Sequence, residues 1–211
     1  MKLSLKQAIT LATKQNKKMQ DLINNTPLNN DIYTNVVRAH LQIVMEHHKA
    51  ICELIVTSQL SALTLVRPLF EEYIKTLWLV TCEGQENVDK AIVGLLERND
   101  NNSFPQIRLM CEELDIKISA LNQVDNRNVL SKHWERNKDV LHSYTHGGSY
   151  LVSLIINKKD LFTQKDILSI LESTTGDMLS SAQSYAVKIR DLPLSQKIYI
   201  KTDNFYKNFK K

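Results

Sequence analysis

Residues 31–57, DIYTNVVRAHLQIVMEHHKAICELIVT, decide the fold of this chain. Apolar side chains recur every three or four residues along them, and neither glycine nor proline occurs between Asp31 and Pro68. This spacing places one set of side chains along one side of an α-helix. The positions on that side are Ile32, Val36, His40, Ile43, Val44, His47, Ile51, Leu54 and Ile55. The segment therefore predicts a long, buried helix over 31–57.

The same helical period continues on both sides of this segment. Further helices are expected at 3–20, 60–82, 86–98, 105–116, 124–146 and 164–190, and residues 150–156, ambiguous between strand and buried helix, are assigned as helix. Pro68 must kink or restart its helix, because proline lacks an amide hydrogen and clashes with the preceding turn. Thr163-Gln164-Lys165-Asp166 has the pattern of a capping box, and Pro193 ends the helix that follows it.

The composition favours an all-α fold. The 211 residues include only five glycines and four prolines, with 43% hydrophobic and 24% charged residues. Sheets need more turn residues than this. A chain of this length buries about 70% of its unfolded surface, which suits a single domain. We expect an up-and-down helical bundle with extra short helices, formed by residues 1–195, followed by a basic tail at 196–211.

The predicted tail carries the net charge. Residues 196–211 contain five lysines and one aspartate, which gives +4, and the net charge of the whole chain is also +4, so the remainder is neutral. Lysines neutralise phosphates and aromatic rings stack on bases, so a segment with both could touch nucleic acid or an acidic partner. The alternative is a solvated terminus that packs partly on the bundle.

The cysteines and the apolar runs indicate a compartment. Cys52, Cys82 and Cys111 lie far apart and form no Cys-x-x-Cys pair, which fits a reducing cytosol. No apolar run approaches the ~20 residues that span a bilayer, and Lys6 interrupts any signal-peptide core. We therefore expect a cytoplasmic protein without a membrane partner.

A dense group of reactive side chains lies in residues 135–148, ERNKDVLHSYTHGG. Its polar positions spaced by four, three and four residues are Glu135, Asp139, His142 and His146. This spacing puts all four on one face of a helix. Arg136 precedes His142 by six residues, so the two point roughly 120° apart at about 100° per residue. A site that uses both residues needs another helix or another subunit.

A second polar feature interrupts the apolar face of the helix predicted at 60–82. Arg67 and Glu71 lie four residues apart and can form an ion pair. Buried charge is costly unless it is paired, so the pair either locks the kink at Pro68 or supports a polar pocket facing the histidine helix. Arg67, Glu71 and Asp139 are the residues expected to support such a site.

Two motifs in these segments resemble known families. Arg136-Asn137, four further residues and then His142-Ser143-Tyr144 resemble the Arg-x(4–6)-His motif of HEPN domains. The segment from Ser61 to Glu71, SALTLVRPLFE, together with HSYTHGG at 142–148, is also similar to a group of largely uncharacterised bacterial helical proteins. HEPN proteins are helical bundles and commonly dimers, and many are metal-independent ribonucleases of toxin–antitoxin and phage-defence systems.

The HEPN resemblance implies roles for individual residues. Arg136 would stabilise a phosphate or a transition state, His142 would be the general acid or base, and Asn137 would be a polar helper. His146, outside the minimal motif, is a further catalytic candidate. In toxins paired with nucleotidyltransferase antitoxins the tyrosine of the motif is adenylylated, which would fall on Tyr144. The chemistry is reasonable in itself, because an imidazole can accept a ribose 2′-hydroxyl proton while arginine offsets charge on phosphorus.

The function expected from this resemblance is a metal-independent endoribonuclease with no cofactor, a homodimer that acts on RNA and is controlled by a nucleotidyltransferase-type antitoxin. Three alternatives stay open. The chain could be a non-catalytic adaptor for a nucleotide, RNA or protein. His142 and His146 could bind a metal with Glu135 or Asp139, helped by His47 or His48 and Glu46. The histidines could also be hydrogen-bonded structural residues, as His47, His48 and Cys52 are expected to be.

Overall fold

The computed structural model describes residues 3–28, 30–98, 104–122, 128–146, 148, 152–153, 156 and 162–209. Across these ranges the chain is helical, and they contain no strand. The helices are α1 (Leu5–Asn24), α2 (Ile32–Thr57), α3 (Gln59–Thr64), α4 (Val66–Thr81), α5 (Glu86–Glu97), α6 (Ile107–Asn122), α7 (Val129–His146), α9 (Gln164–Lys188) and α10 (Leu192–Phe209). The predicted all-α bundle is confirmed. Most of the segment 150–156, assigned as helix from the sequence, lies outside the described residues.

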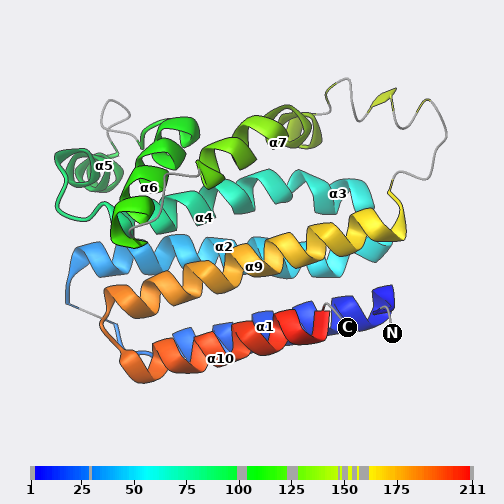
Figure 1. Cartoon of the computed structure of the whole chain (residues 1–211), viewed down its shortest axis with the longest axis horizontal. Helices are drawn as coiled ribbons and strands as arrows, with labels where there is room; N and C mark the ends of the chain where they lie inside the picture. The colour runs from blue at the N-terminus through cyan, green and yellow to red at the C-terminus, as the bar shows by residue number, and fades with distance from the viewer. Residues whose placement is uncertain are drawn as a thin grey trace.

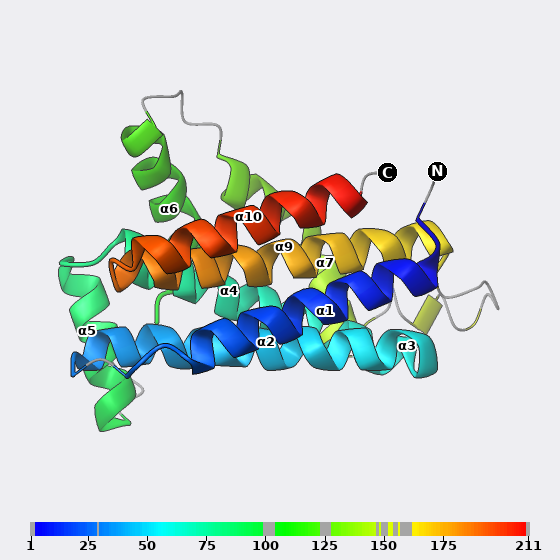
Figure 2. The same cartoon turned by 90° about the horizontal axis from the view of Figure 1, so that it is seen from below.

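Three long helices form the centre of the bundle. α2, α4 and α9 contact one another, α1 and α10 cover one side of them, and α6 and α7 pack on the other side (Figure 1). Both termini lie at the same end of the molecule, as the view from below also shows (Figure 2). Consecutive long helices run in opposite directions, whereas α9 runs in the same direction as α4, because α5, α6 and α7 lie between them along the chain (Figure 1).

The segment 31–57 forms the long helix that its spacing predicts. Asp31 caps α2, accepting hydrogen bonds from the backbone nitrogens of Tyr33 at 3.1 Å and Thr34 at 3.0 Å. The fully buried apolar residues of this helix include Val37, Leu41, Val44 and Ile51. Two residues of the predicted buried side, Ile32 and Ile43, are exposed, whereas Leu41 and Met45, outside the predicted set, are buried, so the buried face is displaced from the predicted one.

The predicted break near Pro68 occurs three residues before it. α3 ends at Thr64 and α4 begins at Val66, which makes Pro68 the third residue of the new helix. The first four amides of a helix have no partner within it, so a proline there sacrifices no helical hydrogen bond. The sequence prediction of a restart is confirmed. The restart also brings Arg67 into the first turn of α4.

The segment predicted as a basic tail packs as part of the bundle. Residues 192–209 form α10, and its side chains Ile198 and Phe205 are fully buried in the main core. Tyr206 explains a glycine inside α9, because a Cβ atom on Gly176 would lie 2.4 Å from the Tyr206 hydroxyl. The domain boundary predicted at residue 195 therefore falls inside a helix.

Candidate functional site

The helix α7 is positioned by a carboxylate from another helix. Asp115 of α6 accepts hydrogen bonds from the backbone nitrogens of Leu130 and Ser131, both at 2.9 Å, and from the Ser131 hydroxyl at 2.7 Å. These are amides of the first turn of α7, which otherwise lack partners. Asp115 is only 5% exposed, so the contact is shielded from water. It fixes where α7 begins.

Apolar contacts then fix which side of α7 faces the bundle. Trp134 stacks on Phe70 of α4 with ring centroids 6.2 Å apart, and Leu141 packs in a cluster with Leu63 of α3. The line of contact leaves a flank of α7 on either side of it. We call the flank with Glu135, Asp139, His142 and His146 the histidine flank, and the flank with His133, Asn137 and Tyr144 the pocket flank.

The histidine flank is the face that the sequence spacing predicts. All four of its residues are exposed, and the rings of His142 and His146 lie 4.6 Å apart between centroids. Nη1 of Arg67 lies 2.7 Å from Nδ1 of His142. Glu135 forms an ion pair with Lys138 at 2.6 Å. The arginine and the two histidines thus form one surface cluster.

Arg67 contacts both Glu71 on its own helix and His142 on the histidine flank. Its Nε donates to Oε1 of Glu71 at 2.7 Å, which confirms the predicted ion pair. Its guanidinium also lies over the Trp134 ring, 5.9 Å from the centroid. Held by Glu71 and Trp134, the group has a defined orientation toward His142. The pair therefore joins the restart of α4 to the histidine flank.

The contact with Arg67 determines which nitrogen of His142 carries the proton. A guanidinium can only donate, so Nδ1 of His142 must be the acceptor. The neutral ring then carries its hydrogen on Nε2, which becomes a donor toward any bound group. No described residue forms a hydrogen bond with the ring nitrogens of His146. The two histidines are consequently suited to different tasks.

Two of the four predicted catalytic residues lie away from this cluster. Arg136 is exposed, and no described residue of the chain forms an ion pair with it. Asn137 lies on the pocket flank, where its side-chain amide donates to the carbonyl of His133 at 2.7 Å. Within one chain the cation beside His142 is therefore Arg67. Asp139 is exposed on the histidine flank, as its spacing predicts.

The tyrosine of the motif is enclosed. Tyr144 is 9% exposed, and its ring packs edge-on against Phe162 with centroids 5.9 Å apart. A transferase must reach the hydroxyl of its target tyrosine. Adenylylation of Tyr144 would thus require Phe162 or α7 to move first.

Two of the remaining candidates, His48 and Cys52, are buried and lie side by side, whereas His47 is partly exposed. His48 lies between Asn16, at 3.1 Å from Nδ1, and the Thr175 hydroxyl, at 2.9 Å from Nε2. Burial lowers the pKa of His48 to about 4, so the ring is neutral near pH 7. Cys52 is also buried, and burial raises the pKa of its thiol to about 12. These residues hold α1, α2 and α9 together, as the structural interpretation predicts.

The described residues contain no group of side chains arranged to bind a metal ion. Among the residues that the structure describes, no three His, Cys, Asp or Glu side chains gather as they would around a metal ion. In the same part of the chain, no helix is both long and apolar enough to cross a bilayer.

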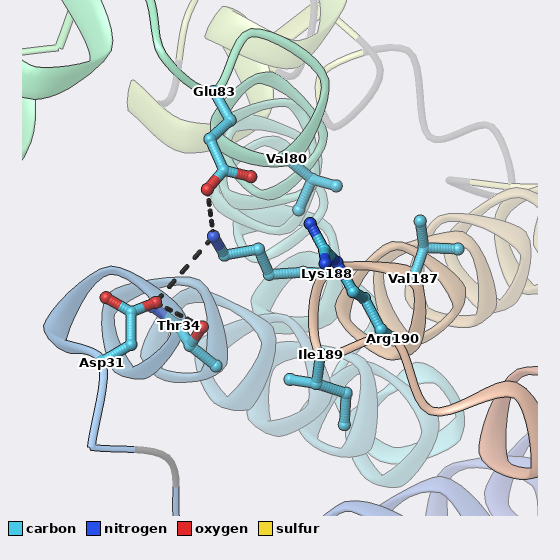
Figure 3. A pocket seen from close by; sticks show the side chains of 8 residues that line it. All are labelled: Asp31, Thr34, Val80, Glu83, Val187, Lys188, Ile189 and Arg190. Atoms are coloured by element: carbon cyan, nitrogen blue, oxygen red, sulfur yellow. Dashed lines mark hydrogen bonds and ion pairs between the residues drawn. The ribbon is translucent and has the colours of Figure 1, made fainter.

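A pocket of about 370 Å³ at one end of the bundle holds several charged side chains (Figure 3). Lys188 of α9 points its amine between Glu83, with which it forms a close ion pair, and Asp31 at 3.9 Å. The same amine lies 4.1 Å from the centroid of the Tyr33 ring. Its charge is thus already compensated by the ends of α2 and α4. We interpret this cluster as a structural contact that joins α2, α4 and α9 rather than as a binding site.

A comparison with models of protein families places the chain in one family. A model described as "Family of unknown function (DUF6988)" matches residues 41–211. The chain belongs to DUF6988. The matched part begins within α2 and includes α4, α7 and α9, hence both flanks of α7. The comparisons with curated proteins and with solved structures gave no match.

Sequence reasoning missed two acidic residues of this region. Asp115 was overlooked because its partners are backbone amides on another helix. Asp177 of α9 lines a second pocket on the other side of α7, and its neighbours Gly176 and Met178 are buried. A charged residue inside a buried stretch of helix was a signal that could have found it.

Proposed function

We propose that this DUF6988 protein is a metal-independent endoribonuclease whose site is the cluster of Arg67, His142 and His146. The observation that supports this most is the 2.7 Å contact between Nη1 of Arg67 and Nδ1 of His142 on an exposed surface. Arg67 takes the position beside the histidine that the resemblance to HEPN domains gives to Arg136. Arg136 could enter the site only from a second subunit of a homodimer.

The roles follow from the hydrogen-bonding capacity of each group. Arg67 and Nε2–H of His142 are donors, so together they hold a phosphate of RNA and offset the charge that develops on phosphorus. His146 accepts the proton of the 2′-hydroxyl as its oxygen attacks the phosphorus atom. The bond to the 5′-oxygen then breaks, and His146 returns the proton to that oxygen. The products are a 2′,3′-cyclic phosphate and a free 5′-hydroxyl.

The experiment is RNA cleavage by the purified full chain in the presence of EDTA. We expect cleavage that leaves 2′,3′-cyclic phosphate ends and that His142→Ala abolishes without unfolding the protein, as circular dichroism would check. Retained cleavage by His142→Ala would overturn the assignment. Loss of cleavage in EDTA would indicate a metal enzyme. Binding of RNA without cleavage would favour the adaptor, and we expect an antitoxin partner to block this same surface.

A further inference from the structure

A second pocket lies between α4, α7 and α9, on the pocket flank of α7. Its volume is about 200 Å³, below the roughly 300–1,000 Å³ of sites for drug-sized ligands, so it suits a small molecule. Tyr144, which faces this pocket, is two residues from His142, a rotation of about 200° around the helix. The pocket is therefore separate from the cluster of Arg67, His142 and His146.

One wall of this pocket is aromatic. Phe70 of α4 is only 4% exposed, and it lines the pocket together with His133 of α7, their ring centroids being 5.3 Å apart. Trp134 stacks on the same Phe70 ring and holds it in place. Partial burial lowers the pKa of His133, so this ring adds no positive charge near pH 7. The wall is thus built from aromatic rings, a kind of surface that attracts cations.

The opposite wall holds a carboxylate without a counter-charge. Asp177 of α9 is the one acid among the described residues that line the pocket, and none of these is a lysine or an arginine. In the described part of the chain its carboxylate accepts no hydrogen bond and forms no ion pair. Burial raises its pKa to about 7. A partly buried carboxylate that lines a pocket without a counter-charge is stabilised when a cation joins it.

The titratable groups around Asp177 do not supply that cation. His133 approaches from α7, Tyr73 from α4 and Tyr206 from α10. Burial raises the pKa of both tyrosines, and the nearby carboxylate of Asp177 raises it further, so both stay neutral. The other polar residues of the lining are uncharged, among them Asn137 and Ser173. The protein thus leaves the positive charge to a ligand.

We propose that this pocket binds a small organic cation, an ammonium or guanidinium compound, whose charge pairs with Asp177 while its carbon atoms lie against Phe70. Asn137 and Ser173 can accept its remaining N–H groups. The inference is independent of the proposed ribonuclease activity, because it concerns the other flank of α7. It is tested without RNA.

The test is a titration of the full chain with benzylamine, followed by two-dimensional NMR of the backbone amides, with benzyl alcohol as the neutral probe of the same shape. We expect benzylamine to shift amides of α7 and α9 around Asn137 and Asp177, and benzyl alcohol to bind at least tenfold more weakly. Asp177→Asn should weaken benzylamine binding about tenfold to a hundredfold, the usual worth of a hydrogen-bonded charge. Glu172→Gln, an acid on the same helix that does not line the pocket, should change nothing.

Two further measurements keep the inference falsifiable. Ser173→Phe, at an exposed position on the rim, should block benzylamine even if Asp177→Asn proves unstable. Affinity should rise about tenfold between pH 6 and pH 8, as Asp177 ionises while benzylamine stays protonated. Equal binding of amine and alcohol, full binding by Asp177→Asn, or shifts confined to other helices would each overturn the proposal.

Discussion

The histidine flank of α7 exposes its reactive groups and pairs His142 with Arg67, whereas the pocket flank faces Asp177 of α9, which has no cation among the described residues around its pocket. On the first flank Arg67 is bound by Glu71 and by His142, so its charge and direction are set by neighbours. On the second, Asp177 faces a pocket without a cation among its described lining residues. One helix therefore borders two surfaces of different chemistry. We propose a polyanion as the ligand of the first and a cation as the ligand of the second.

The largest difference is expected between two histidines of the same helix. His146→Ala should reduce RNA cleavage by a factor of about 10² to 10⁴, the usual contribution of a proton-transfer group. His133→Ala, on the pocket flank, should leave cleavage within about threefold. Single-turnover rates on a short RNA would measure both. Similar losses in both variants would show that the flanks do not act separately.

The pH dependence of stability should differ when Asp177 is neutralised. Its pKa is 3.8 in an unfolded chain and about 7 in the fold, so the folded form binds more protons between these values. Stability is then fully present below pH 3.8 and is lost as the pH rises through 7. The variant Asp177→Asn does not lose stability in this way, because an asparagine side chain does not ionise. Relative to the wild type it should gain up to about 4 kcal/mol between pH 4 and pH 8, at about 1.4 kcal/mol per pKa unit.

Urea unfolding at several pH values would measure this gain. Subtracting the free energies of unfolding of the two proteins removes the contribution of His48, which titrates in both. His48, with a folded pKa of about 4 against 6.5 unfolded, costs stability as the pH falls through 6.5 toward 4. That cost is the same in both proteins. A difference that does not change with pH would contradict an enclosed, unpaired Asp177.

A change at Asp115 should disturb both flanks at once. Asp115→Ala removes the acceptor for two amides and a hydroxyl at the start of α7, which should cost about 2–3 kcal/mol in urea unfolding. Cleavage of RNA and binding of benzylamine should fall together while the protein stays folded. Asp166→Ala removes the acidic member of the exposed capping box of α9 and serves as the control, with a cost of about 1 kcal/mol and both activities kept. Loss on one flank alone would mean that α7 is held by other contacts.

The smallest effect is expected at Glu71. Glu71→Gln keeps the size of the side chain but removes the charge that orients Arg67, a pair that is partly exposed to water. Exposed pairs contribute about 1 kcal/mol or less, so cleavage should fall only about twofold to fivefold. The pocket flank provides the control for this variant, because the affinity for benzylamine should be unchanged in Glu71→Gln. A loss as large as that of His146→Ala would assign Glu71 a direct part in catalysis.

The sequence predicted the parts of this structure that depend on short stretches of chain. The helix at 31–57, the capping box that begins α9 at Thr163 and the Arg67–Glu71 pair all depend on residues within a few positions of one another. The displaced buried face of α2 and the packing of α10 could not be predicted the same way. Both depend on which helices lie alongside, information that the local period does not contain.

The site shows the same limit. The spacing correctly placed the four residues of the histidine flank on one face and Arg136 off that face. It could not show that Arg67, 75 residues earlier in the chain, fills the position beside His142. Asp177 was missed for the same reason, because its pocket exists only where α4, α7 and α9 meet. The motif indicated which helix carries the histidines, whereas the residues that lie beside that helix became visible only in the fold.

The most direct test of this account compares two arginines. Arg67→Ala and Arg136→Ala remove the same group, one beside His142 and one at an exposed position away from it. The proposed site predicts that Arg67→Ala lowers RNA cleavage in EDTA about a hundredfold or more, as loss of a charge-stabilising donor does, and that Arg136→Ala stays within about threefold of the wild type. Full activity in Arg67→Ala, with activity lost in Arg136→Ala, would contradict the account and return the site to the arginine of the HEPN-like motif.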